Sequence, residues 1–125
     1  MLGDIRAIAT VAVSDLKKAE AFYEGTLGLK VEAREGEEVV SYATGGTVLN
    51  VYPSRYAGTN KATAATWVVG DRLDAVVAAL AAKGVVFEHY ELPGMKREGD
   101  VHVGGDLRVA WFKDPDENIH NLVSG

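Results

Sequence analysis

Hydrophobic and polar positions follow one pattern that occurs twice along the chain. Each copy opens with a β-prone run, residues 8–13 in the first copy and 64–69 in the second. A stretch with helical spacing follows each run, and three further short β-prone runs come after it. The pattern predicts two βαβββ repeats, at about residues 5–54 and 62–124, within a single domain of the α+β class covering residues 1–125.

Polar residues between each first strand and its helix predict where the helices begin. Ser14 or Asp15 is the N-cap candidate of the first helix, and Asp71 is that of the second. A glycine lies thirteen residues after each aspartate, at Gly28 and at Gly84. We expect Gly84 to end the second helix in a left-handed conformation.

Both predicted helices carry an apolar stripe. Residues at positions i, i+3, i+4 and i+7 share one face of a helix, which then packs on a sheet. The stripe of the second helix consists of Leu73, Val76, Val77 and Leu80. A similar spacing occurs in the first repeat at Leu16, Ala19, Phe22 and Tyr23.

The remaining strands of the two repeats differ at one connection. The β-prone runs are 30–34, 39–43 and 47–52 in the first repeat, and 85–90, 107–112 and 119–123 in the second. Residues 91–106 form a glycine-rich segment that is much longer than the corresponding turn after Arg34. Long connections are either functional lids or disordered and decorative loops, and the sequence leaves both possibilities open.

Composition narrows the class of protein further. The 125 residues are 47% hydrophobic and 25% charged, as in globular proteins, and this argues against disordered and membrane classes. A net charge of −5 without a basic cluster argues against nucleic acid as a partner. The lack of cysteine excludes zinc–cysteine sites, iron–sulfur clusters and thiol nucleophiles. With no secretory pattern at the N-terminus, we expect a cytoplasmic protein.

Several motifs together resemble the vicinal oxygen chelate superfamily, which includes glyoxalases, bleomycin-resistance proteins and extradiol dioxygenases. They are Val-Ser-Asp-Leu at 13–16, Ala-Phe-Tyr at 21–23, Leu-Gly-Leu at 27–29 and Phe-Lys-Asp-Pro-Asp-Glu-Asn at 112–118. The resemblance implies a curled mixed sheet that forms a half-barrel cup, with helices on its outer face and the site inside. It also implies a homodimer, because in this family two such units often complete each other's cups.

The resemblance also locates a metal site. Metal-dependent members take one ligand, usually His or Gln, from the first strand of each repeat, and another, usually Glu, from the last strand of each. The positions that match are Ile8, Ala64, Asn50 and Asn121. Two hydrocarbon side chains and two neutral amides do not make a divalent metal site. We therefore expect no metal and no cofactor; a one-residue shift in this alignment would introduce only His120.

The histidines show no spacing of paired metal ligands. His89, His102 and His120 lie in a predicted strand, in the long connection and in the last strand, and each is more often structural than catalytic. His102 is the most favourable candidate, because the long connection could fold over the cup. Without a Gly-x-Ser-x-Gly motif or a cysteine, the chain offers no visible nucleophile for hydrolysis.

A cup without a metal can still hold an organic molecule. Alternation along the strands places small and polar side chains on one face, whereas Trp67 has the opposite parity and is expected to pack under a helix. Asn50 and Asn121 offer hydrogen-bond donors and acceptors to a ligand, although they could instead bond one another or a buried water. The predicted ligand-binding residues are Asn50, Tyr52, Thr10, Thr66, Asn121, Trp111, His102 and Met95.

Three functions are compatible with these features. The first is a metal-free binding protein of the resistance or sequestration type, which holds an aromatic or other planar compound. The second is a lyase, isomerase or dioxygenase of the same superfamily that uses a non-standard metal site or acid–base groups such as His102, Glu91 or Tyr52. The third is an interaction or regulatory module with a vestigial cup.

Overall fold

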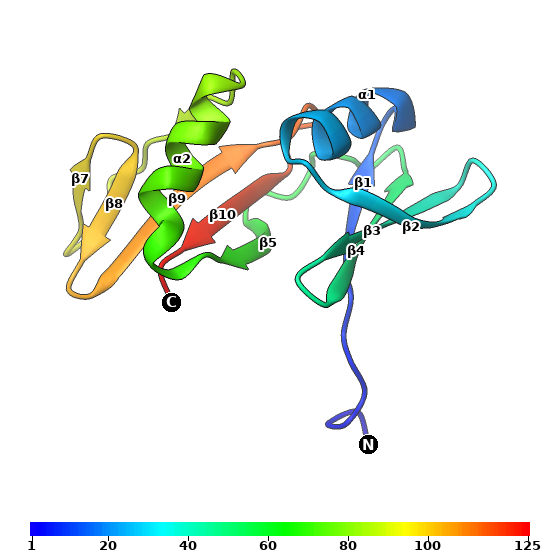
Figure 1. The fold of residues 1–125 in the computed structure, drawn as a ribbon, viewed down its shortest axis with the longest axis horizontal. Coiled ribbons are helices and arrows are strands. Elements are labelled where there is room, and N and C mark those ends of the chain that lie inside the picture. Colours follow the sequence, from blue (N-terminus) through cyan, green and yellow to red (C-terminus); the bar gives the residue numbers. More distant parts are fainter. The chain divides into compact units, whose positions relative to one another are not determined.

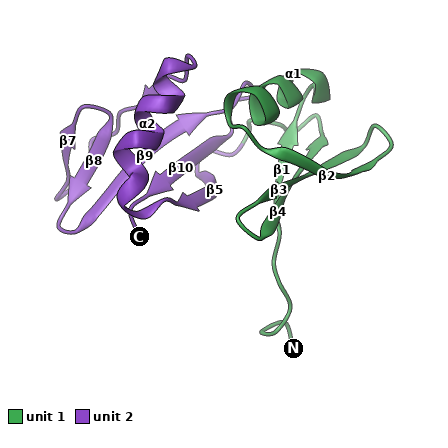
Figure 2. Cartoon of the chain, in the orientation of Figure 1, with its two compact units in different colours: residues 1–59 green, residues 60–125 purple.

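The computed structural model describes all of residues 1–125 (Figure 1). The chain divides into two compact units, unit 1 with residues 1–59 and unit 2 with residues 60–125 (Figure 2). One predicted repeat lies within each unit. Each unit contains a mixed β-sheet and a helical segment, which confirms the α+β fold class.

Unit 1 contains four strands and one helical segment. Its elements are β1 (Ala9–Val13), α1 (Leu16–Glu20), the π-helical turn η1 (Ala21–Thr26), β2 (Lys30–Glu35), β3 (Val39–Thr44) and β4 (Thr47–Pro53). The strand order is β1-β4-β3-β2, with β1 parallel to β4 and the other pairs antiparallel. The three strands after the helical segment match the predicted runs to within a residue.

The helical segment of unit 1 begins where the sequence predicts. Of the two candidates, Asp15 is the N-cap, and its carboxylate accepts hydrogen bonds from the backbone N–H groups of Lys17 and Lys18 at 2.9 and 3.4 Å. The helix continues from α1 into η1, and the chain leaves it through Gly28 at a φ of 75°. A side chain at Gly28 would be strained in this left-handed conformation.

The core of unit 1 lies between the sheet and the helical segment. The strands direct alternate aliphatic and aromatic side chains to this side, and the buried ones are Val11, Val13, Val40, Tyr42, Leu49 and Val51. The ring of Tyr23 stacks on that of Tyr42 at 6.0 Å. The Tyr42 hydroxyl donates to Glu24 at 2.9 Å, and burial together with this carboxylate raises the pKa of Tyr42. The Tyr42 hydroxyl is therefore protonated, and the hydrogen bond holds η1 on the sheet.

Unit 2 repeats this topology with an additional hairpin. Its elements are β5 (Thr63–Val68), the 3₁₀ turn η2 (Gly70–Arg72), α2 (Leu73–Ala82), β6 (Phe87–Glu88), β7 (Lys96–Glu98), β8 (Val101–Gly104), β9 (Leu107–Lys113) and β10 (Ile119–Val123). The strand order is β5-β10-β9-β8-β7, and β6 also pairs with β9. As in unit 1, the first and last strands are parallel.

The long connection of unit 2 is neither a plain lid nor a disordered loop. Strands β7 and β8 pair with each other, and β8 pairs with β9, so the hairpin extends the sheet. The predicted strand 85–90 is correspondingly short, because only Phe87 and Glu88 pair with β9. The prediction missed the hairpin because Lys96–Glu98 is an exposed, charged strand without a hydrophobic alternation.

The start of α2 corrects another prediction. Asp71 lies in η2 and is not the N-cap of the helix, because the 3₁₀ turn moves the start of α2 to Leu73. The end agrees with the prediction, since Gly84 has a φ of 94° and its N–H donates to the carbonyl of Ala81. Neither the length nor the hydrophobicity that a membrane-spanning helix requires is reached by any helix of this chain.

Helix α2 covers one face of the unit 2 sheet. Leu73, Val77 and Leu80 of the predicted stripe are buried, whereas Val76 is half-buried. Arg108 of β9 makes a bidentate ion pair with Asp74 of α2 at 2.9 and 3.0 Å. Arg108 and every second residue from it along β9 therefore face the helix. Residues of the other parity lie on the opposite face of the sheet, where the candidate site is found.

Candidate functional site

Three predicted residues of unit 1 share the sheet face opposite its helices. Thr10 and Asn50 are direct partners in the parallel pair β1–β4, and Tyr52 follows two residues later with 37% of its surface exposed. Ser41 on β3 lies beside Asn50 and donates its hydroxyl to the Asn50 side-chain oxygen at 2.6 Å. The Thr10 hydroxyl donates to the carbonyl of Ile8 at 3.3 Å. The Asn50 oxygen is thus already engaged within the sheet.

The corresponding face of unit 2 brings together Thr66, Asn121 and Trp111. Asn121 of β10 is paired with Thr66 on one side and with Trp111 on the other. The indole N–H of Trp111 donates to the Thr63 hydroxyl at 3.2 Å. In contrast to Asn50, the Asn121 side-chain oxygen is buried and has no hydrogen-bond partner. The Asn121 oxygen is therefore a hydrogen-bond acceptor that the sheet leaves unsatisfied.

His102 lies on this same face of unit 2. It pairs with Val109 of β9, its ring centroid is 4.9 Å from that of Trp111, and only 1% of the residue is exposed. The backbone N–H of Tyr90 donates to its Nε2 at 2.9 Å. Tyr90 was not among the predicted site residues. Two-residue alternation from Glu88, which pairs with Trp111, could have placed Tyr90 on this face.

Met95 lines a cavity of about 420 Å³ in unit 2. The other lining residues are Tyr90, Glu91, Leu92 and Arg97. The Met95 side chain lies against Gly104 of β8. A Cβ atom added to Gly104 would be only 3.0 Å from the Met95 Cγ. Tyr90 lines this cavity together with Met95, and its ring centroid is 6.2 Å from that of His102.

Of the other two histidines, His120 lies on the opposite face of the sheet, and the ring centroid of His89 is 6.5 Å from that of His102. His120 is fully buried on the side of the sheet that faces α2, with ring centroids 5.5 Å from Trp67 and 5.6 Å from Phe112. Burial lowers the pKa of His120 to about 4, although the Asp114 carboxylate opposes this effect. His89 is half exposed and its Nε2 is 2.8 Å from Asp100. Trp67 packs on the α2 side, as its parity predicts.

The positions expected for metal ligands do not fit a metal ion. Ile8 and Ala64 have hydrocarbon side chains, and the Asn50 oxygen accepts the Ser41 hydrogen bond. His120 cannot replace Asn121, because it points to the opposite side of the sheet. No group of three or more His, Cys, Asp or Glu side chains in the chain could hold a metal ion.

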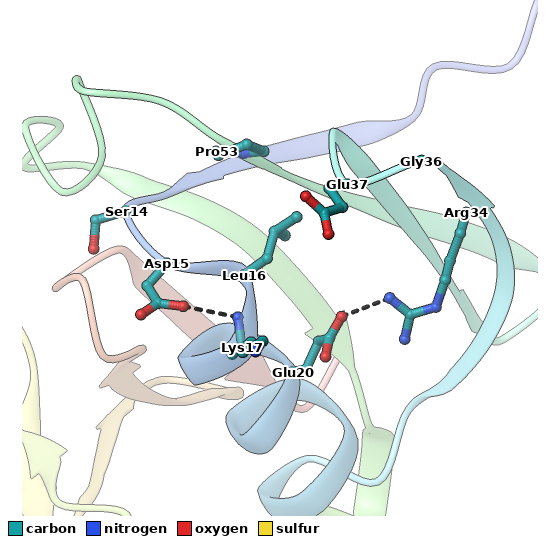
Figure 3. A pocket seen from close by; sticks show the side chains of 9 residues that line it. All are labelled: Ser14, Asp15, Leu16, Lys17, Glu20, Arg34, Gly36, Glu37 and Pro53. Atoms are coloured by element: carbon teal, nitrogen blue, oxygen red, sulfur yellow. Dashed lines mark hydrogen bonds and ion pairs between the residues drawn. The ribbon is translucent and has the colours of Figure 1, made fainter.

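A second pocket lies beside α1 in unit 1 (Figure 3). It measures about 500 Å³ and is lined by Ser14, Asp15, Leu16, Lys17, Glu20, Arg34, Gly36, Glu37 and Pro53. Asp15 caps the helix here, and Glu20 accepts a hydrogen bond from Arg34 at 2.5 Å (Figure 3). Asp15, Glu20 and Arg34 thus already bind one another or the backbone. None of the predicted site residues lines it.

The chain thus consists of two βαβββ units, and each unit has polar side chains on the sheet face opposite its helix. This arrangement defines the class of proteins to which the chain is compared. The chain matches the profile of the Glyoxalase/Bleomycin resistance protein/Dioxygenase superfamily over residues 5–121, and it belongs to that superfamily. No curated protein matches the chain in sequence.

Solved structures share the fold at low sequence identity. One is the E126Q mutant of the fosfomycin resistance protein FosX from Listeria monocytogenes, complexed with Mn(II) and 1S,2S-dihydroxypropylphosphonic acid (TM-score 0.71, 19% identity, covering 100% of this chain and 92% of that one). Another is the lactoylglutathione lyase from Agrobacterium tumefaciens (0.71, 15%, 98% and 95%). The oxidase ChaP-H2 is a third (0.70, 22%, 98% and 94%). At these identities the similarity establishes the fold only.

Proposed function

We propose that this protein binds a small apolar or aromatic compound without a metal ion, on the sheet faces opposite its helices. The observation that carries the proposal is the Asn121 side-chain oxygen, which is buried and lacks a hydrogen-bond partner. An unpaired buried acceptor costs about 1–3 kcal/mol, and a ligand donor would recover this free energy. The replacement of ligating residues by Ile8, Ala64 and two amides supports a site that works without metal.

Two variants test the assignment of Asn121. We expect Asn121→Ala to weaken a bound compound by about 1–3 kcal/mol while the fold stays intact, because the lost amide makes no hydrogen bond through its oxygen. Asn60→Ala is the matched control, since Asn60 lies in an exposed loop. Affinity is measured by thermal shift with hits from a screen of metabolites and antibiotics. Unchanged affinity in Asn121→Ala would show that this amide is not part of the site.

Metal analysis tests the other half of the proposal. We expect the purified protein to hold far less than one equivalent of zinc, nickel, manganese or iron per chain. A chelator should leave its melting temperature unchanged, because no metal contributes to folding. A stoichiometric metal would contradict the metal-free site and favour a lyase, isomerase or dioxygenase.

We also propose that the protein is a cytoplasmic homodimer. Strand β1 ends one sheet and β5 ends the other, and such edges have backbone groups that can pair with a further strand. Light scattering at micromolar concentration should give twice the 13.3 kDa mass of one chain. A species with the mass of a single chain would refute the dimer without affecting the ligand site.

A further inference from the structure

Three polar atoms on one face of unit 2 are buried without a partner. They are Tyr90 Oη, His102 Nδ1 and Asn121 Oδ1. Buried polar groups in proteins are almost always hydrogen-bonded, so three such atoms within one small region require an explanation. His102 is only 1% exposed, and therefore bulk water cannot satisfy its ring.

The hydrogen bond to His102 determines which ring nitrogen carries the proton. Because the Tyr90 backbone N–H donates to Nε2 at 2.9 Å, Nε2 is an acceptor and the neutral ring carries its hydrogen on Nδ1. Nδ1 is thus a buried donor that lacks an acceptor. This donor is held in place by the β8 strand and by the Tyr90 backbone.

The Tyr90 hydroxyl provides a second donor. Burial is the main cause that raises the pKa of Tyr90, and the Glu88 carboxylate adds to it, so the hydroxyl keeps its proton. Lys113 lies 3.4 Å from Glu88 and compensates its charge. The region therefore has N–H and O–H donors that suit an oxygen acceptor. Arg97, the cross-strand partner of His102, lines the same cavity and donates to the carbonyl of Gly99 at 2.8 Å.

Aromatic rings form the apolar part of the same region. The centroid of Trp111 is 4.9 Å from that of His102 and 5.3 Å from that of Tyr90, with both rings nearly perpendicular to the indole. The Trp111 N–H is already bonded to Thr63. Tyr90 also lines the cavity of about 420 Å³, which lies in the size range of small-ligand sites.

We infer that unit 2 recognises a planar compound with a carbonyl oxygen. The oxygen accepts hydrogen bonds from His102 Nδ1 and the Tyr90 hydroxyl, and the ring of the compound packs against Trp111. The inference rests on the proposed binding function and adds the chemical class of the ligand. Tyr90 and His102 are the specificity-determining residues of this site.

Two matched probes test the inference. Acetophenone has the planar ring and the carbonyl oxygen, and ethylbenzene has nearly the same shape without the oxygen. Binding of each to the full chain is followed by the NMR signal of the Trp111 indole N–H. We expect acetophenone to bind more tightly than ethylbenzene, because only acetophenone has an oxygen that accepts hydrogen bonds.

His102→Gln and Tyr90→Phe separate recognition from folding. A glutamine oxygen can still accept the Tyr90 backbone N–H, but this variant has no donor at the Nδ1 position. Each variant should reduce acetophenone affinity about 5- to 10-fold, the value of one hydrogen bond. Ethylbenzene affinity should change less than about 2-fold in both variants, because neither loses a bond to this probe.

Several results would overturn this inference. These are no acetophenone binding at 10 mM, equal affinity for acetophenone and ethylbenzene, or unchanged acetophenone affinity in both variants. If other compounds still raise the melting temperature and need Asn121, the proposed binding function survives and only the ligand class is wrong. If no compound of any class binds, the proposed function itself fails.

Discussion

His120 should make the folded state sensitive to acid. The ring is fully buried between Trp67 and Phe112, and burial lowers its pKa from an ordinary 6.5 to about 4. In the unfolded chain the same ring binds a proton at about pH 6.5, so acid favours unfolding. Its contribution to stability is present above pH 6.5 and is lost as the pH falls toward 4.

The two pKa values determine the size of this effect. Relative to pH 7.5, His120 alone should lower the free energy of unfolding by about 2 kcal/mol at pH 5 and by about 3 kcal/mol at pH 4. The Asp114 carboxylate is the charged group that acts on this ring, and it moderates the loss by favouring the protonated form. Carboxylates that titrate below pH 5 add their own effects, so pH 5 is the clearer comparison.

The assay is urea unfolding at pH 7.5, 6.5, 5.5 and 5.0, followed by tryptophan fluorescence. Both tryptophans, Trp67 and Trp111, belong to unit 2, so the signal reports the unit that contains His120. His120→Phe removes the titrating group and keeps an aromatic ring among its neighbours. Between pH 7.5 and 5.0 the wild type should lose about 2 kcal/mol more than this variant.

His89→Gln is the control, because His89 is a half-exposed histidine of the same unit. This variant should keep the acid sensitivity of the wild type. Equal losses in the wild type and His120→Phe would refute the reasoning, since the buried ring would then not be the group that binds the proton on unfolding.

Three further predictions concern turns and close contacts in unit 2. Asp114→Ala should cost about 2–3 kcal/mol, because the carboxylate accepts the backbone N–H of Asn118 at 2.9 Å and its side-chain amide at 2.8 Å; urea unfolding measures the loss. Glu117→Gly should raise stability by about 0.5–1 kcal/mol in the same assay, since Glu117 has a φ of 68°. Gly104→Ala should cost about 1–2 kcal/mol through its approach to Met95, and adding Met95→Ala should restore most of the loss in melting temperature.

Sequence patterns predicted the repeated parts of the fold well, because local physics determines them. The glycines thirteen residues after the two aspartates both adopt left-handed conformations, Gly28 at 75° and Gly84 at 94°. The buried stripe of α2 and the position of Trp67 under that helix follow from periodicity. The helix cap at Asp15 is an equally local feature.

Features that depend on distant pairing were missed. The hairpin Lys96–Gly104 is part of the sheet because β8 pairs with β9. No local sequence pattern indicates this pairing. The Ser41 hydrogen bond to Asn50 joins two strands, so the sequence alone could not distinguish Asn50 from Asn121. Alternation could have placed Tyr90 on the correct face, but its role depends on contacts with His102 and Trp111.

The most direct test of metal-free ligand binding is a thermal-shift titration of chelator-treated protein with small planar compounds. The account predicts at least one compound that raises the melting temperature in a concentration-dependent way while the chelator is present. It also predicts that Asn121→Ala reduces this rise, and that added zinc or manganese does not increase it. A rise that occurs only after metal is added would contradict the account.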